Sequence, residues 1–238
     1  MPKRWCNSAE IRRSQIESGL DVTFCDVFVP LYTEKIRLLK PKSILEIGCG
    51  TGHLSKALAS LNTQITAIEP SIGMFDVASK VLAGTQVQLL NLTSYDLKID
   101  TKFELIFSHL VAHVVDRENE FFQSARRLLD DQGCFLFSIP HPCFYNEYKK
   151  LFKSDYQYMT RMYKNITFEI TNDPLNSITE VPYHHRPISD YINSLSDSGF
   201  VISSMHEIFP SMDIQKKYGA HWDTPRYCLF VCKKLKDF

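Results

Sequence analysis

Three glycines alternate with other residues at the point where a predicted strand meets a predicted helix. Gly48, Gly50 and Gly52 follow Glu46 in the run E-I-G-C-G-T-G. Glycines at such a junction let the backbone turn tightly and let a ligand lie against the main chain, near the amino terminus of a helix. This spacing predicts a ligand-binding loop.

An acidic residue follows the glycine loop at a distance that suits a nucleoside. Glu69 ends the segment I-T-A-I-E, the next predicted strand along the chain, about twenty residues beyond the loop. A carboxylate at that point accepts hydrogen bonds from both hydroxyls of a ribose. The loop and the acidic residue together indicate a nucleoside site more specifically than the loop alone.

Two classes of nucleotide cofactor bind to such a loop, and the residues here distinguish them. The dinucleotide fingerprint is G-x-G-x-x-G, whereas His53 stands where its third glycine belongs. Glu46 also precedes the loop, and a carboxylate there repels a pyrophosphate and attracts a cation. The residues therefore favour a nucleoside that carries a cationic tail.

Strands and helices that alternate along the chain must position these residues. Apolar runs predict strands at 43–47, 64–68, 87–90, 103–108, 134–139, 200–204 and 226–233. Helical periodicity predicts helices at 25–39, 53–61, 72–82, 118–129 and 188–198. The pattern predicts an α/β fold with a doubly wound, mostly parallel seven-stranded sheet that has helices on both faces. We expect a single domain over residues 1–238.

The α/β rhythm is interrupted after the fifth strand by an aromatic-rich insertion over residues 141–182. Open α/β sheets bind ligands at the carboxyl ends of their strands, where this insertion begins. Lysines interleave with the aromatic residues, as in surfaces that stack bases. The positive charge of the lysines is partly offset by three acidic residues, Glu147, Asp155 and Glu169. We therefore expect the insertion to form a lid over the ligand site rather than a surface that binds nucleic acid.

Composition excludes several other classes of protein. The chain has 238 residues, 44% of them hydrophobic, and its 27 basic residues balance 27 acidic ones. It has no global field to attract nucleic acid or an anionic membrane. The amino terminus is polar, and no stretch reaches the ~20 apolar residues that span a bilayer. The seven cysteines are scattered and include no C-x-x-C pair. We expect a cytoplasmic protein without metal, and its oligomeric state is left open.

The loop resembles the first motif of the class I S-adenosylmethionine-dependent methyltransferases, E/D-x-G-x-G-x-G, in a Rossmann-like fold. The resemblance extends over roughly 43–140 and implies S-adenosyl-L-methionine as cofactor. It implies that the three glycines line the methionine tail beside Glu46, and that Glu69 binds the ribose. It further implies that Ile72 and Met74 border the adenine, and that Ser108 or His109 lies near the methionine group.

One position departs from the family pattern. Members often have an acidic residue after the third strand, near the adenine amino group. Here the segment reads L-N-L-T-S, with Asn91 and Leu92 at that point. We expect either the Asn91 side chain or the Leu92 backbone to accept that hydrogen bond.

A second stretch resembles the small-molecule methyltransferases of the family. Residues 183–191 read Y-H-H-R-P-I-S-D-Y, and S-I-P-H-P stands at 138–142. The resemblance implies transfer of a methyl group to an O, N or C nucleophile of a small metabolite. The alternatives are a tRNA or protein methyltransferase and a non-catalytic module that binds the cofactor.

A base is needed only if the acceptor must lose a proton. The candidates are five histidines: His109, His113, His141, His184 and His185. His141, directly after the fifth strand, has the best topological position to face the acceptor, and His109 is the second choice.

Overall fold

The computed structural model describes residues 8–219 and 221–235. Their contacts divide the chain into two compact units. Unit 1 comprises Met1–Thr93, Thr167–Val181 and Pro210–His221, and unit 2 comprises Ser94–Ile166, Pro182–Phe209 and Trp222–Phe238. The polar segment that precedes Ser8, including Cys6, lies outside the described residues.

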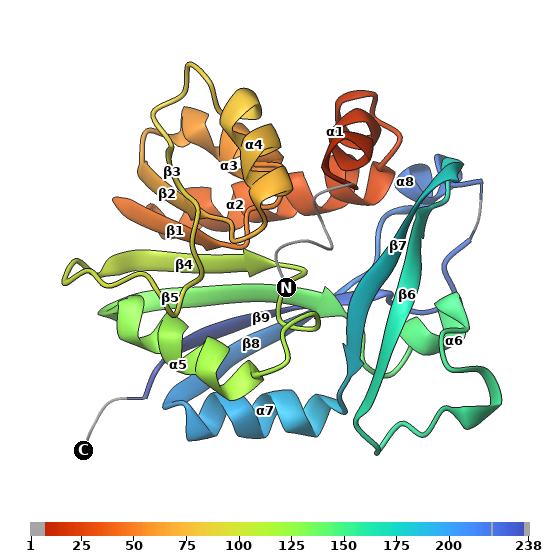
Figure 1. The fold of residues 1–238 in the computed structure, drawn as a ribbon. Helices are drawn as coiled ribbons and strands as arrows, with labels where there is room; N and C mark the ends of the chain where they lie inside the picture. The colour runs from red at the N-terminus through yellow and green to blue at the C-terminus, as the bar shows by residue number, and fades with distance from the viewer. Residues whose placement is uncertain (1–7, 220, 236–238) are drawn as a thin grey trace. The chain divides into compact units, whose positions relative to one another are not determined.

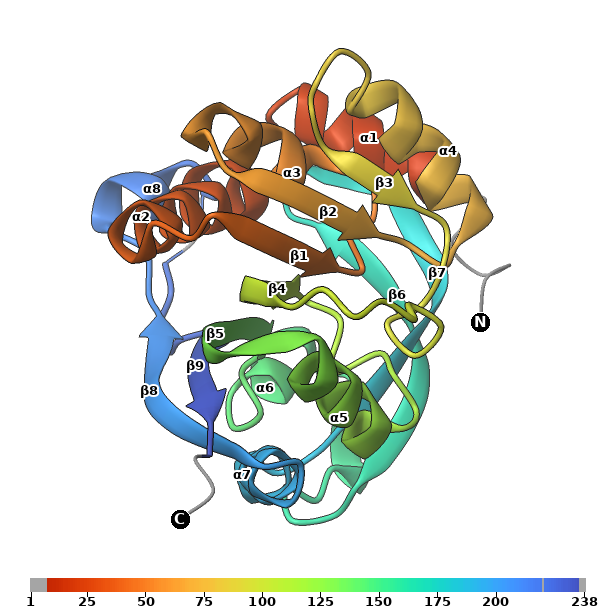
Figure 2. The ribbon, with the colours of Figure 1, turned by 90° about the vertical axis from the view of Figure 1, so that its left-hand side faces the viewer.

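Unit 1 contains three parallel strands in the order β3-β2-β1 (Figure 2). Its strands are β1 (Ser43–Ile47), β2 (Gln64–Ile68) and β3 (Gln88–Leu90). Its helices are α1 (Ala9–Glu17), the π-helical turn η2 (Thr23–Phe28), α2 (Val29–Leu39), α3 (His53–Leu58), the short 3-10 turn η3 (Ala59–Leu61), α4 (Ile72–Val81) and α8 (Met212–Lys216).

The register of these strands brings their carboxyl ends to one edge. Ile47 of β1 is paired with Ile68 of β2, and Ile68 is paired with Leu90 of β3. Strands β1 and β2 are rich in branched apolar residues, and Ile44, Leu45 and Ile68 are fully buried. The chain leaves each strand at the same edge, so the glycine loop and Glu69 start from neighbouring positions.

Unit 2 contains four strands in the order β4-β5-β9-β8 (Figure 1). Its strands are β4 (Phe103–His109), β5 (Leu129–Pro140), β8 (Phe200–Ile208) and β9 (Tyr227–Lys234). Its helices are α5 (Glu118–Leu128), α6 (Tyr145–Lys149), the 3-10 turn η4 (Lys153–Asp155) and α7 (Ile188–Asp197). Strand β9 runs antiparallel to β5 and to β8, whereas β4 and β5 are parallel.

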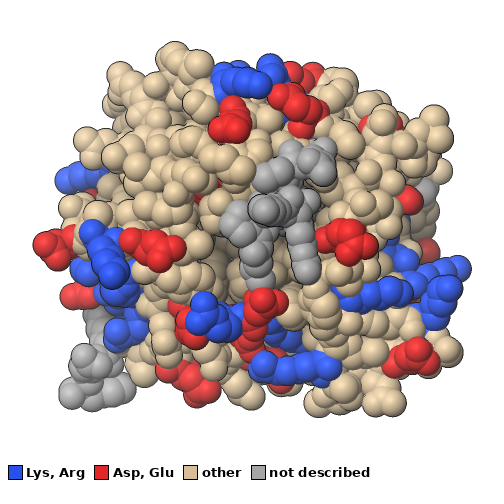
Figure 3. All heavy atoms as spheres, viewed as in Figure 1, with Lys and Arg blue, Asp and Glu red and all other residues tan. Residues whose placement is uncertain are grey.

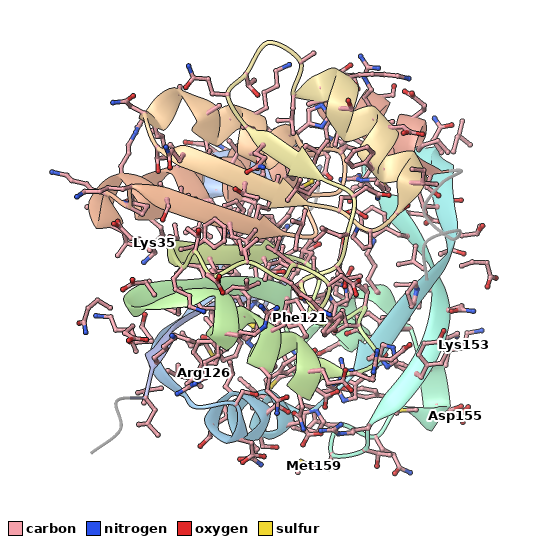
Figure 4. The ribbon with its side chains drawn as sticks, turned by 60° about the vertical axis from the view of Figure 1, so that its left-hand side comes forward. Lys35, Phe121, Arg126, Lys153, Asp155 and Met159 are labelled. Carbon is pink, nitrogen blue, oxygen red and sulfur yellow. The ribbon has the colours of Figure 1, made fainter. Side chains whose placement is uncertain are left out.

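Aromatic side chains form the core of unit 2. Phe137 of β5 stacks on Phe230 of β9, with ring centroids 4.8 Å apart and planes inclined by 5°. Phe122 of α5 packs against Phe137 at 5.2 Å, and Phe121 and Phe122 are almost fully buried. Figure 4 labels Phe121 on α5. These contacts hold α5 against β5, the strand that ends at Pro140.

The seven predicted strands are confirmed, three in unit 1 and four in unit 2, and the sheet is mostly parallel as predicted. The expected helix over 25–39 is instead the π-helical turn η2 followed by α2. Strand β5 also begins earlier than expected, at Leu129, because Leu129 is already extended and is paired with Phe103 of β4.

The insertion has more regular structure than its sequence suggests. Strands β6 (Met162–Ile170) and β7 (Asp173–His185) form a separate two-stranded sheet. The part of this hairpin over Thr167–Val181 belongs to unit 1, and its remainder belongs to unit 2. In the described ranges, 8–219 and 221–235, no helix is both long and apolar enough to cross a membrane.

Candidate functional site

Backbone hydrogen bonds fold the glycine loop over the end of β2. The N–H groups of Gly48 and Cys49 both donate to the carbonyl oxygen of Ile68, at 2.9 and 3.0 Å. The N–H of Gly50 donates to Oε2 of Glu69 at 2.9 Å. The loop and the acidic residue that the sequence singled out are therefore joined directly in unit 1.

All three glycines of the loop, Gly48 included, adopt backbone angles that side chains resist. Gly50 has φ of 55° and Gly52 has φ of 78°, both in the left-handed region. A Cβ at Gly52 would lie 3.1 Å from Cγ of Leu82, whereas a Cβ at Gly50 would meet nothing within 4 Å. Gly52 therefore allows α3 to start close to α4, and Gly50 keeps its surroundings open.

Glu69 is buried, and both of its carboxylate oxygens accept backbone hydrogen bonds. Oε2 accepts from Gly50, and Oε1 accepts from the N–H of Ser71 at 2.8 Å. Burial raises the pKa of Glu69, and these two hydrogen bonds oppose the rise. A carboxylate has about four acceptor positions. Glu69 therefore keeps capacity for ligand hydroxyls while it holds the loop.

Glu46 at the end of β1 is the second buried carboxylate of the site. It is 2% exposed and accepts a hydrogen bond from the hydroxyl of Ser55 on α3. Burial raises its pKa to about 7, and the charge of Glu69 adds to the rise. A cation placed beside Glu46 would favour its ionised form. The pair therefore suits a ligand that carries positive charge.

The segment after β3 presents an amide where the family often has an acid. Nδ2 of Asn91 donates to the carbonyl oxygen of Glu69 at 2.7 Å, which leaves its Oδ1 as an acceptor. The N–H of Leu92 donates to Leu90 at 3.2 Å. On α4, Met74 is buried in a cluster with Ala9, whereas half of Ile72 is exposed.

Helix α1 adds contacts to the loop that the sequence did not indicate. Nδ1 of His53 lies 2.8 Å from the hydroxyl of Thr51, and its Nε2 lies 3.6 Å from a carboxylate oxygen of Glu17. Burial lowers the pKa of His53, and Glu17 opposes that change. Arg13 also binds Glu17, at 3.0 Å. The end of α1 is thereby linked to the glycine loop within unit 1.

Unit 2 holds the candidates from the end of β4. Ser108 is fully buried. His109 follows it, and its Nδ1 lies 2.8 Å from the hydroxyl of Ser138 on β5. The next residue, Leu110, has φ of 54°, so the chain turns sharply after the strand. His109 therefore lies at the carboxyl end of β4, and its Nδ1 already has the hydroxyl of Ser138 as a partner.

His141 is 2% exposed and both of its ring nitrogens have partners. Nδ1 accepts from the N–H of Cys143 at 3.2 Å, and Nε2 lies 3.0 Å from Oε1 of Glu207 on β8. This arrangement places the ring proton on Nε2. Burial lowers the pKa of His141, and Glu207 opposes that change. A base role for His141 would require one of these hydrogen bonds to open.

The other candidate histidines of unit 2 belong to its framework. His184 lies 2.9 Å from a carboxylate oxygen of Asp116, and Nε2 of His185 lies 2.9 Å from a backbone carbonyl oxygen. Burial lowers the pKa of His113 to about 3. Arg186 is 3% exposed and pairs with a buried glutamate and three carbonyl groups. Within the described part of the chain, no three His, Cys, Asp or Glu residues are arranged to hold a metal ion.

Comparison with known proteins agrees with this geometry. Residues 44–133 match the family model described as a methyltransferase domain. A malonyl-[acyl-carrier protein] O-methyltransferase of Priestia megaterium is 32% identical over 98 residues, which are 40% of this chain and 36% of the relative. A ubiquinone biosynthesis O-methyltransferase of Coxiella burnetii is 32% identical over 112 residues, 45% of this chain and 47% of the relative. The matched region thus spans a third to a half of these curated relatives.

Solved structures extend the likeness to the whole fold. An S-adenosylmethionine-dependent methyltransferase of Clostridium acetobutylicum has a TM-score of 0.67 and 17% identity, with 96% of this chain and 98% of the other covered. At that identity the likeness establishes the fold. Residues 44–133 are thus similar to a methyltransferase domain, and the chain has the fold of a solved S-adenosylmethionine-dependent methyltransferase.

Proposed function

We propose that this protein binds S-adenosyl-L-methionine at the glycine loop of unit 1 and transfers its methyl group to a small metabolite. The observation that carries the proposal is the buried carboxylate of Glu69, which is bonded to Gly50 and keeps acceptor capacity for a ribose. Glu46, whose pKa is raised to about 7 by burial, supplies the charge for a cationic amino-acid tail.

The residues present fit that cofactor, and their roles follow from their chemistry. Glu46 and the three glycines would hold the amino-acid tail, Glu69 the ribose, and Asn91 or Leu92 the adenine edge. The cofactor supplies an electrophilic methyl group on a sulfonium, and the protein must align the acceptor and exclude water. Met74 would contribute to the adenine side through α4.

The acceptor side of the proposal rests on unit 2. Ser108 and His109 end β4, and His141 follows β5, so these residues occupy the strand ends where open α/β sheets bind ligands. We keep His141 and His109 as candidate bases and the 141–182 insertion as the acceptor lid. Lys153, Asp155 and Met159 of that insertion project outward in Figure 4.

A small acceptor is preferred over a polymer because the charges are balanced and dispersed. Acidic and basic side chains are intermixed on the face drawn in Figure 3. That face shows no continuous basic track of the kind that tRNA needs. The protein is also proposed to be cytoplasmic, because its scattered cysteines suit a reducing compartment.

The test is a transfer assay with S-adenosylmethionine that carries a labelled methyl group. The full chain is incubated with pools of small metabolites, bulk tRNA and bulk protein, and the label is followed by mass spectrometry. We expect label in a small product and none in the polymers. Label in tRNA or protein would contradict the assigned acceptor class, and cofactor binding without transfer to any pool would favour the non-catalytic alternative.

A further inference from the structure

Arg226 lies at the carboxyl end of β5, although it comes more than eighty residues later in the sequence. It immediately precedes β9, and Tyr227 of β9 is paired with Pro140 of β5. The carbonyl oxygen of Arg226 accepts a hydrogen bond from the N–H of His141 at 2.8 Å. Arg226 therefore stands at the strand end where an α/β sheet binds its ligands.

Two aromatic rings clamp the guanidinium group of Arg226. Its Cζ lies 3.7 Å from the ring centroid of Tyr148 on α6 and 4.1 Å from that of Trp222. Trp222 is 1% exposed and packs against Tyr227 at 6.3 Å. Tyr148 packs edge-on against Tyr145 at 6.0 Å. The clamp is thus built from side chains that are themselves held in place.

The nitrogen atoms of the guanidinium have no hydrogen-bond partner among the described residues. Among residues 8–219 and 221–235, no hydrogen bond or ion pair engages the side chain of Arg226. The residue is 8% exposed, and none of its nitrogens belongs to the buried polar atoms that lack a partner. A small part of Arg226 therefore remains in contact with solvent. Arg186, also buried, instead pairs with Glu118 at 3.2 Å.

The nearby acidic side chain is already engaged. Glu207 is opposite Cys228, two residues beyond Arg226, and its Oε1 lies 3.0 Å from Nε2 of His141. A nearly buried cation without an anion is costly, and the aromatic faces offset only part of that cost. A planar anion that accepts from the N–H groups of Arg226 would offset the rest of that cost.

We propose that Arg226 binds a carboxylate of the methyl acceptor. The two aromatic rings hold the guanidinium through its positive charge, and its planar N–H fork matches the two oxygens of a carboxylate. The carboxylate is a recognition handle and not the methylated atom, because donated hydrogen bonds draw electron density from the oxygen that would attack. The identification of this carboxylate ligand as the methyl acceptor rests on the proposed function.

The test is an NMR titration of the full-length protein with acetate, acetamide and inorganic phosphate as probes. Acetate and acetamide have nearly the same shape and differ in charge. We expect acetate to shift the Nε–H resonance of Arg226 and to bind at least tenfold more tightly than acetamide. Arg226→Gln should weaken acetate binding at least tenfold, and Arg226→Lys should weaken it less, because lysine keeps the charge but loses the fork.

A matched control and the wild-type protein keep the proposal falsifiable. Arg117 lies 5.8 Å from the ring of Tyr95 but is exposed and paired with Glu120, so Arg117→Gln should leave acetate binding unchanged. Equal binding of acetate and acetamide by the wild type would overturn the proposal, even if Arg226→Gln fails to fold. Tighter binding of phosphate than of acetate would also overturn the carboxylate assignment. These titrations need no methyl transfer, so their failure is distinguishable from failure of the proposed function.

Discussion

Glu69 and Glu46 are both buried in unit 1, but different groups hold them. Glu69 is held by two backbone N–H groups, and Glu46 by the hydroxyl of Ser55. Burial raises the pKa of both carboxyls. Two neighbouring acids in such a place repel each other until a cation arrives. Their functions can therefore be separated by mutation.

Substitution of Glu69 should weaken cofactor binding without unfolding the protein. Glu69→Ala removes the acceptor of the ribose hydroxyls and frees the N–H of Gly50. We expect a loss of about 2–4 kcal/mol in the binding free energy of S-adenosylmethionine, measured by calorimetry. Glu34→Ala, at an exposed position on α2, is the control and should bind normally. Equal affinities in the two folded variants would refute the role of Glu69.

The pKa of Glu46 should make cofactor affinity depend on pH. The ionised carboxylate attracts the cationic tail, and burial holds its pKa at about 7 in the free protein. Binding must release that proton at low pH, so affinity should fall about tenfold between pH 8 and pH 6. Glu46→Gln should bind more weakly and lose most of this dependence. The same slope in the variant and the wild type would show that another group titrates.

At the level of residues, the sequence predicted the loop and Glu69 because both belong to one local strand–loop–helix pattern. It did not single out Ser55, Glu207 or the clamp around Arg226. Arg226 contacts Tyr148 because β9 pairs with β5. The spacing of these residues in the sequence does not predict that contact. Sites built from neighbouring residues can therefore be predicted from one sequence, whereas contacts between distant segments cannot.

At the level of elements, apolar runs predicted the central strands, because strands buried on both faces are continuous apolar segments. Helix α1 and the β6–β7 hairpin were missed. Helix α1 is mostly polar, with the sequence A-E-I-R-R-S-Q-I-E, and most positions of β6 and of the first half of β7 are not buried. These elements depend on each other, and neither has the periodicity of a core element.

Gln15 of α1 should be the main anchor of the hairpin tip. It is 1% exposed, and its Nε2 donates to Oδ2 of Asp173 at 3.1 Å and to the carbonyl oxygen of Asn176 at 2.9 Å. Gln15→Ala leaves those acceptors without a donor. We expect the free energy of local opening over 167–181 to fall by about 1–2 kcal/mol, measured by hydrogen exchange. The partly exposed neighbour Arg13, which pairs with Glu17, should not alter exchange there when it is changed to Ala. Similar exchange in both variants would contradict the role of Gln15 as the anchor.

At the level of the whole molecule, equal numbers of acidic and basic residues leave little net charge near neutral pH. The pH dependence of stability then comes from individual buried groups. Burial, helped by the charge of Arg186, lowers the pKa of His113 from 6.5 to about 3. The folded protein keeps this imidazole neutral, while the unfolded chain takes up a proton below pH 6.5.

His113 should therefore destabilise the protein in mild acid. Stability is lost as the pH falls from 6.5 toward 3, and the loss at pH 5 should be about 1–2 kcal/mol. Urea unfolding of the wild type and of His113→Gln at pH 7 and pH 5 measures it, and the variant should lose less on acidification. His221→Gln, at an exposed histidine, serves as the control. An identical loss in wild type and His113→Gln would contradict the prediction.

The central claim is that the loop of unit 1 binds S-adenosylmethionine and not a dinucleotide. Calorimetric titration of the wild-type protein with S-adenosylmethionine, and in parallel with nicotinamide adenine dinucleotide, tests it most directly. The positions of Glu46 and His53 predict one molecule of S-adenosylmethionine bound per chain and no measurable binding of the dinucleotide. Binding of the dinucleotide, or no heat from S-adenosylmethionine with a protein that circular dichroism shows to be folded, would contradict it.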